Sequence, residues 1–233
     1  MKKLILELLC SFGYLFLGSM IELCVTTIFP LENFVLEMIF SSLGFAISFS
    51  WLYFLTNRKY RLEINPIFTF SLWLRNQISF RQLFITILFQ LLGAVLAGGL
   101  LYVLFSDISS LVLGYGTHSM FYASLNTILL IEMLFSFVLV FCFLILIDSN
   151  IHYKKRSILL GIILFILLFL SIPYTGGVVH PLHSISINLF VNSDSLRQSW
   201  IYALSNLAGS LLAVTFYCFY SFLNHKVTLQ HFS

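Results

Sequence analysis

Glu63-Ile64-Asn65-Pro66-Ile67 and Val179-His180-Pro181-Leu182-His183 are the two stretches that decide the fold, because each interrupts an apolar region at a matching place in one half of the chain. Backbone N–H and C=O groups need hydrogen bonds in hydrocarbon, so an interrupted segment at membrane depth must be buried in protein or line a cavity. Paired interruptions in repeated halves point to the place where a membrane protein handles its solute. The two stretches are therefore the predicted functional site.

The composition indicates an integral membrane protein. Hydrophobic residues make up 60% of the chain and charged residues only 9%, which is far less charge than the surface of a soluble domain needs. No small-residue cleavage site follows the first apolar segment, so we expect it to be retained and not removed as a signal peptide. Six segments are long enough to cross about 30 Å of hydrocarbon: Leu4–Thr26, Val35–Leu55, Leu83–Phe105, Ile128–Ile147, Ser157–Ile172 and Ile201–Leu223.

The positive charges predict the orientation in the membrane. Of the twelve Lys and Arg residues, all except Arg197 fall on one side of a six-span arrangement. Because cytoplasmic loops are enriched in Lys and Arg, we expect both termini in the cytoplasm, most simply at the cell membrane, with Ser106–Met120 and Asn192–Ser199 outside. The net charge of +3 then reflects topology and gives no reason to expect a nucleic-acid partner.

The chain repeats itself. Glu7-Leu8-Leu9-Cys10-Ser11-Phe12 in the first span is echoed by Glu132-Met133-Leu134-Phe135-Ser136-Phe137 in the fourth. Three spans per half is an odd number, so the second copy enters the membrane from the opposite side. We therefore predict one all-α channel domain, residues 1–233, built as an inverted 3+3 repeat of residues 1–105 and 124–223.

Each half also carries one helix too short to cross. Asn65–Trp73 would extend only about 14 Å as a helix, and Pro66 suits its first turn. The second copy is expected at Pro181–Phe190. Inverted symmetry brings the two helix N-termini together at the midplane, where their N–H donors and partial positive charge repel cations and orient a neutral polar solute. Asn65 is either only the helix cap or also a donor to the solute, and we favour the second role.

These motifs and their order resemble the aquaporin and glycerol-facilitator family, the major intrinsic proteins. Ile64-Asn65-Pro66-Ile67-Phe68-Thr69 resembles the family's first Asn-Pro-Ala motif, and Glu7 to Gly18 resembles its start. Tyr174-Thr175-Gly176-Gly177, followed by His180-Pro181-Leu182-His183-Ser184, falls where the family has Thr-Gly and then Asn-Pro-Ala-Arg-Ser. The resemblance implies six transmembrane helices plus two re-entrant half-helices, and a homotetramer with a pore in each protomer.

The chain departs from the family pattern inside the motifs. Ile67 and Leu182 replace Ala, His180 replaces the second Asn, and His183 replaces the filter Arg. The resemblance places the outer selectivity filter at Leu43 or Phe45, Leu168, Gly177 and His183, with Leu43 preferred. Such a filter is more apolar than the family pattern, because it lacks the permanent charge of the arginine. It either admits glycerol-like solutes or is narrowed by leucines until it dewets.

The remaining polar residues are given structural roles. The resemblance implies that Glu7 and Glu132 brace the re-entrant loops, and a proton relay is the alternative. Glu22 and Glu63 are expected near an interface. The third ligand that a metal bound to His180 and His183 would need is offered only by His118 in the outer loop, so no metal is expected. Small residues that allow close helix contact are expected at Gly93, Gly98, Gly99 and Gly209. The cysteines follow no framework spacing.

Three functions compete. The first is a passive channel for water and small neutral solutes such as glycerol. The second is an ion-coupled secondary transporter, because inverted repeats with broken helices also describe carriers. The third is a degenerate, weakly conducting relative with a structural role. The only partners expected are solute, lipid and further copies of the chain, and no motif for a nucleophile, a metal or another cofactor supports an enzyme.

Overall fold

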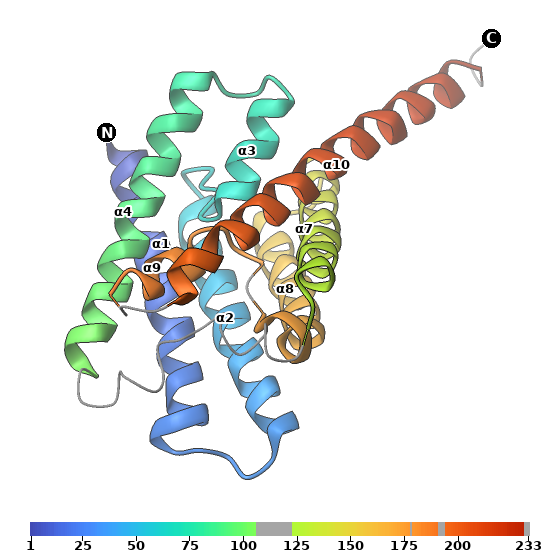
Figure 1. Ribbon diagram of the computed structural model, residues 1–233. Coiled ribbons are helices and arrows are strands. Elements are labelled where there is room, and N and C mark those ends of the chain that lie inside the picture. Colours follow the sequence, from blue (N-terminus) through green and yellow to red (C-terminus); the bar gives the residue numbers. More distant parts are fainter. Residues whose placement is uncertain (106–122, 178, 191–193, 231–233) are drawn as a thin grey trace.

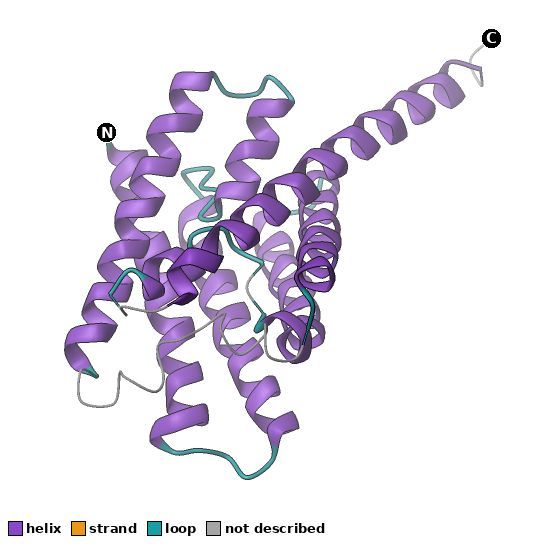
Figure 2. Ribbon diagram, in the orientation of Figure 1, coloured by secondary structure: helices purple, strands orange, loops and turns teal. Residues whose placement is uncertain are grey.

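The computed structural model describes residues 1–105, 123–177, 179–190 and 194–230, except for the side chains of 194, 195 and 224–230. Helices dominate these residues, and no strand occurs among them (Figure 2). The predicted outer loop Ser106–Met120 and the beginning of the predicted outer segment at 192 lie outside the described residues.

Six of the helices are long and apolar enough to cross a membrane, as predicted. Each of them begins before the first residue of its predicted span. In chain order the elements are α1 (Lys2–Leu23) with its π-helical continuation η1 (Cys24–Ile28), α2 (Phe34–Asn57), α3 (Pro66–Leu74), α4 (Phe80–Leu104), α7 (Leu125–Asp148), α8 (Tyr153–Thr175), α9 (His183–Asn188) and α10 (Asp194–Gln230). The two short helices are α3 and α9. The prediction of α3 was close, but the predicted helix Pro181–Phe190 was too long, because a turn occupies its first two residues.

Local sequence sets where the helices begin and end. The Asn33 side chain accepts from Val35 N–H and so caps α2. Ser79 and Gln82 form a reciprocal capping box at the start of α4, and the Ser124 hydroxyl caps α7. Gly176 ends α8 in the left-handed conformation at φ 79°, which glycine adopts without steric cost. These caps satisfy N–H groups that helix starts leave without partners.

The two halves of the chain use equivalent helices in equivalent contacts. Helix α1 packs against α4 and α2, and α7 packs against α10 and α8. In Figure 1, α1 and α4 stand on one side of the bundle and α7 and α8 on the other, and the far end of α10 projects beyond the bundle. Helix α3 packs against α4, α7 and α10, and α9 packs against α4 and α10. The short helices and the loops that precede them thus lie inside the bundle.

Small residues bring the first and last long helices of each half into contact. A Cβ added to Gly93 of α4 would collide with the backbone oxygen of Leu8 in α1, and one added to Gly209 of α10 would collide with that of Met133 in α7. The predicted packing role of these glycines is confirmed. Their positions match between the halves, so the helix that follows each short helix lies directly on the helix that carries a buried glutamate.

The outer face of the bundle is apolar. On α4, exposed leucines recur every four residues and form one stripe, which is the spacing of a single helix face. The members of this stripe are Leu88, Leu92, Leu96 and Leu100. An apolar stripe of this length facing outward is suited to lipid, while the polar residues point inward.

Candidate functional site

Glu7 holds the first re-entrant loop. Its carboxylate accepts hydrogen bonds from the backbone N–H of Glu63 at 2.9 Å and of Ile64 at 3.0 Å. The same carboxylate accepts from the Gln90 side-chain amide of α4 at 2.9 Å. Glu7 is fully buried, and in a site of low dielectric these charge-assisted bonds are strong. The carboxylate therefore satisfies backbone donors that the membrane interior offers no water to satisfy.

Glu132 holds the second loop in the same way. One carboxylate oxygen accepts from Val179 N–H at 3.0 Å and from the Asn206 side-chain amide of α10 at 2.9 Å. The other accepts from the Thr175 hydroxyl at 2.7 Å. Each half thus joins a glutamate of its first helix, a loop N–H and an amide side chain of its last helix. This geometry is the one that loop bracing requires.

Both loops are strained at the same place. Ile64, directly before Asn65, has φ 65°, and Val179, directly before His180, has φ 36°. Positive φ is rare for β-branched residues, costs about 1–3 kcal/mol, and persists only where the surroundings impose it. The surroundings here are the Glu7 and Glu132 carboxylates, which bind the N–H groups of the two strained residues.

The two loops meet at Asn65. Its side-chain oxygen accepts from Ile67 N–H at 3.1 Å and caps α3, with Pro66 at the first helical position. Its amide nitrogen donates to the Val179 carbonyl at 3.2 Å, across from one loop to the other. Asn65 is therefore a cap and also a donor between the two loops, while its donation to a solute stays a prediction.

His180 stands opposite Asn65 in the second loop. Its Nδ1 accepts from Leu182 N–H at 3.3 Å, which is the same bond to the second residue onward that Asn65 makes, but here it closes the turn before α9 and does not cap the helix. Its ring lies 5.3 Å from the Tyr14 ring. Pro181 and Leu182 form the turn before α9, and no group of three metal-ligating side chains occurs among the described residues.

His183 lies at the start of α9 between two helices of the first half. Its Nε2 is 3.3 Å from the Ser19 hydroxyl of α1, and the Phe45 ring of α2 meets it edge-on at 5.1 Å. Of the two positions considered for the second span, Phe45 lies beside His183. Leu43 instead lines a groove between α2 and α8 together with Phe165, so the geometry favours Phe45.

Leu168 and Gly177 also come together. Leu168 is buried in α8, and a Cβ added to Gly177 would meet Ile172 and the Leu168 carbonyl. The left-handed φ of 72° at Gly177 suits glycine. The end of α8 therefore turns back on itself at this glycine, and the chain then enters the second loop.

A continuous row of aromatic rings runs through the interior. Phe45 and Phe49 both contact Tyr14, with ring centres 5.7 and 5.8 Å away. Phe49 contacts Phe68 of α3 at 6.0 Å, and Phe68 stacks on Phe143 of α7 at 4.0 Å. Together with the contact between Phe45 and His183, the row leads from His183 past the loop junction.

The row ends at a cavity of about 380 Å³ at the end of the bundle that carries the N-terminus. Phe143, Tyr53 and Leu72 belong to its wall, and so do charged residues from several elements. Glu63 is one of them, and it pairs with Lys3 at 3.0 Å. Burial and the neighbouring Glu7 carboxylate raise the pKa of Glu63, and Lys3 opposes this rise.

Some site residues were not predicted. Gln90 and Asn206 bind the two glutamates, and Ser19 binds His183. Their signal in the sequence is a polar residue inside an apolar span, which marks a bundle interior. Glu63 and Glu22 were expected near an interface, but both are buried. Glu63 contributes its N–H to the brace, and Glu22 lies on the same inward stripe of α1 as Tyr14 and Gly18.

These features define an integral, multi-pass membrane protein whose re-entrant loops meet in the interior between two buried glutamates. Residues 1–217 match the sequence model of the family described as major intrinsic protein. The chain belongs to that family.

Two known proteins illustrate the similarity. Aquaporin Z of Rhodopseudomonas palustris is 27% identical to the chain over 187 residues, which is 76% of either sequence. The X-ray structure of the aquaglyceroporin from Plasmodium falciparum superposes with a TM-score of 0.79 at 19% identity, covering 92% of this chain and 94% of that one. The structural match shows that the fold is shared.

Proposed function

We propose that the protein is a passive transmembrane channel for water and small neutral solutes such as glycerol. The observation that supports this best is the junction at Asn65, where two braced loops of opposite halves touch through the bond from its amide to the Val179 carbonyl. A polar solute that passes this point can accept from the same amide in place of the carbonyl. Family membership over residues 1–217 gives the junction its functional context.

Electrostatics supports a neutral solute. Helix α3 directs its N-terminus, with a partial positive charge, at the junction. The filter position holds His183, whose described neighbours Phe45 and Ser19 are uncharged. A cation that reaches this depth meets no fixed compensating charge at the junction, because Glu7 and Glu132 are committed to N–H and amide donors.

The assembly is part of the same proposal. Residues 1–105 and 124–223 form two inverted repeats within one channel domain, and four copies associate in the cell membrane with both termini in the cytoplasm. The matching braces of the two halves support the inverted repeat, and the apolar outer stripe of α4 supports its place in the membrane. The filter comprises His183, Phe45, Leu168 and Gly177.

Stopped-flow light scattering on proteoliposomes, with water, glycerol and urea compared, tests the proposal. Asn65→Asp keeps the oxygen that caps α3 and replaces the donor amide by an oxygen that faces the Val179 carbonyl. We expect at least a severalfold loss of glycerol flux at normal folding and assembly. A well-assembled variant with unchanged permeability would remove Asn65 from the path.

One observation favours a weakly conducting relative as the second candidate. The row Phe45, Tyr14, Phe49, Phe68 and Phe143 is buried and in mutual contact, so its rings occupy the interior between filter and cavity. If these rings limit the flux of solute, Phe68→Val should raise that flux, because the stack of Phe68 on Phe143 is lost. Unchanged low flux in Phe68→Val favours the structural role.

An ion-coupled carrier is tested in the same vesicles. Counterflow and saturation of glycerol uptake are expected for a carrier and not for a channel. A pH gradient that drives solute accumulation would assign Glu7 or Glu132 to proton transfer and would contradict passive permeation.

A further inference from the structure

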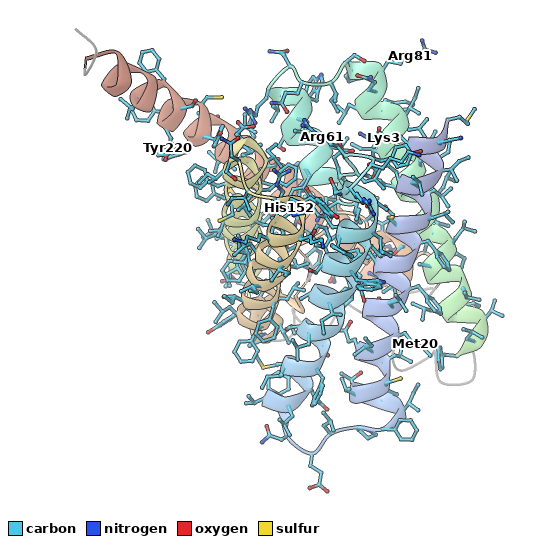
Figure 3. The ribbon with its side chains drawn as sticks, turned by 180° about the vertical axis from the view of Figure 1, so that it is seen from behind. Lys3, Met20, Arg61, Arg81, His152 and Tyr220 are labelled. Carbon is cyan, nitrogen blue, oxygen red and sulfur yellow. The ribbon has the colours of Figure 1, made fainter. Side chains whose placement is uncertain are left out.

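The cytoplasmic-facing cavity of about 380 Å³ is walled by both charged and polar side chains. It is large enough for a small metabolite. Its cations are Lys3, Arg61 and Arg156, and its anions are Glu63 and Asp148. Figure 3 shows Lys3 and Arg61 toward the same end of the bundle as Arg81.

The anions of the cavity already have partners. Glu63 pairs with Lys3 at 3.0 Å. Asp148 receives hydrogen bonds from Arg75 at 2.6 Å and from the Tyr217 hydroxyl at 2.6 Å. Arg75 is not part of the cavity wall, so it neutralises Asp148 from outside.

Two guanidinium groups are left over. Arg61 and Arg156 form no ion pair among the described residues, where the pairs found are Lys3–Glu63 and Arg75–Asp148. Arg156 donates one bond to the Ile151 carbonyl at 3.3 Å, and its positive charge also acts on Tyr53 and Asp148 of the same wall. A guanidinium carries five N–H donors, so the two arginines that line the cavity keep donors for an anion there.

We propose that this cavity binds a phosphate dianion, as inorganic phosphate or as the phosphate of a small monoester. Arginine presents a planar fork of donors that matches phosphate oxygens, and Arg61 and Arg156 reach the cavity from different elements, the loop after α2 and the start of α8. Tyr53, Asn57 and Gln77 add polar atoms to the same wall. The positive-inside bias explains on which side these arginines lie, but it does not explain why they line an interior cavity.

Phosphate bound here would also block the solute path. Phe143 belongs to both the cavity wall and the aromatic row, so the cavity is the cytoplasmic mouth of the path proposed above. The block rests on that proposed function, whereas the binding does not. A failure of permeation therefore leaves the binding test intact.

Binding is measured by titration calorimetry on the full chain in phosphatidylcholine nanodiscs, with inorganic phosphate, glycerol 3-phosphate and acetate as probes. We expect heat with the two phosphates and none with acetate. Arg61→Gln and Arg156→Gln should each raise the dissociation constant about tenfold or more, because each loses a charge-assisted bond. Arg61 is exposed, so we expect Arg61→Gln to fold normally. This variant therefore keeps the test valid even where Arg156→Gln disturbs folding.

Arg81→Gln is the matched control. Arg81 is an exposed arginine in the first turn of α4, on the same side of the bundle, and it does not line the cavity. It should bind phosphate as the parent does. Equal weakening in Arg81→Gln and Arg61→Gln, or absence of phosphate binding in the parent, would overturn the site.

Phosphatidylglycerol nanodiscs distinguish a soluble phosphate from a lipid headgroup. If lipid phosphate fills the cavity, phosphatidylglycerol competes with inorganic phosphate, and the competition is lost in Arg61→Gln but kept in Arg81→Gln. If a soluble phosphate fills it, the affinity is the same in both lipids.

In proteoliposomes, glycerol 3-phosphate on the N-terminal side should lower glycerol flux in the parent and in Arg81→Gln, but not in Arg61→Gln.

Discussion

Replacing Glu7 by glutamine tests how the first re-entrant loop is held. The carboxylate accepts from two loop N–H groups and from the Gln90 amide. Glutamine has nearly the same shape, but it keeps only one acceptor oxygen and turns an NH₂ group toward a buried donor. Hydrogen bonds to charged groups contribute roughly 1.5–3 kcal/mol each, and an unsatisfied buried donor costs a similar amount. We expect Glu7→Gln to destabilise the protein by about 2–4 kcal/mol.

The measurement is thermal unfolding of detergent-solubilised protein. A loss of this size should lower Tm by about 5 °C or more in a domain of this length. Glu32→Gln is the control, because Glu32 is exposed in the loop between α1 and α2 and should leave Tm unchanged. Since the Glu7 carboxylate binds the N–H of Ile64, which has a positive φ of 65°, flux through Glu7→Gln should fall together with stability.

Two results would refute this reasoning. A Tm equal to that of the parent would mean that the carboxylate contributes nothing to the loop. A normal Tm together with loss of a proton-driven flux would assign Glu7 to proton transfer and not to bracing.

Three further predictions concern selectivity, packing and topology. His183→Arg should lower glycerol permeability relative to water severalfold in stopped-flow assays, because arginine is larger and always charged; the same selectivity in His183→Arg and in the parent would place the ring outside the filter. Gly98→Ala should destabilise the protein by about 1–3 kcal/mol, because the added Cβ collides with the backbone oxygen of Ser186 in α9. Its control is Gly13→Ala, whose Cβ meets only the Leu52 side chain at 3.3 Å and which should unfold at the parent temperature. In a cysteine-free background, a single cysteine at exposed Glu32 should react with an impermeant reagent from outside the cell, and one at exposed Asn76 should react from inside. The reverse labelling would contradict the proposed orientation.

The amino-acid sequence by itself determined the number of membrane spans and the presence of two interrupted segments. Lipid imposes long apolar helices and leaves their length and order readable in one dimension. Asn65-Pro66 also specifies its own helix start, because the cap and the fixed φ of proline act within a few residues. The observed α3, Pro66–Leu74, therefore follows the prediction closely.

Only the tertiary structure decided which of the polar residues meet. Gln90 and Asn206 are far in sequence from Glu7 and Glu132, and their bonds depend on close helix contacts at Gly93 and Gly209. The choice between Phe45 and Leu43 depends on the rotation of α2 about its axis, which an apolar helix without a polar face does not encode. The length of α9 depends on the turns that enclose it, at residues 181–182 before the helix and 189–190 after it. These features arise from packing between distant segments, because contact between helices is set by the shapes of both partners.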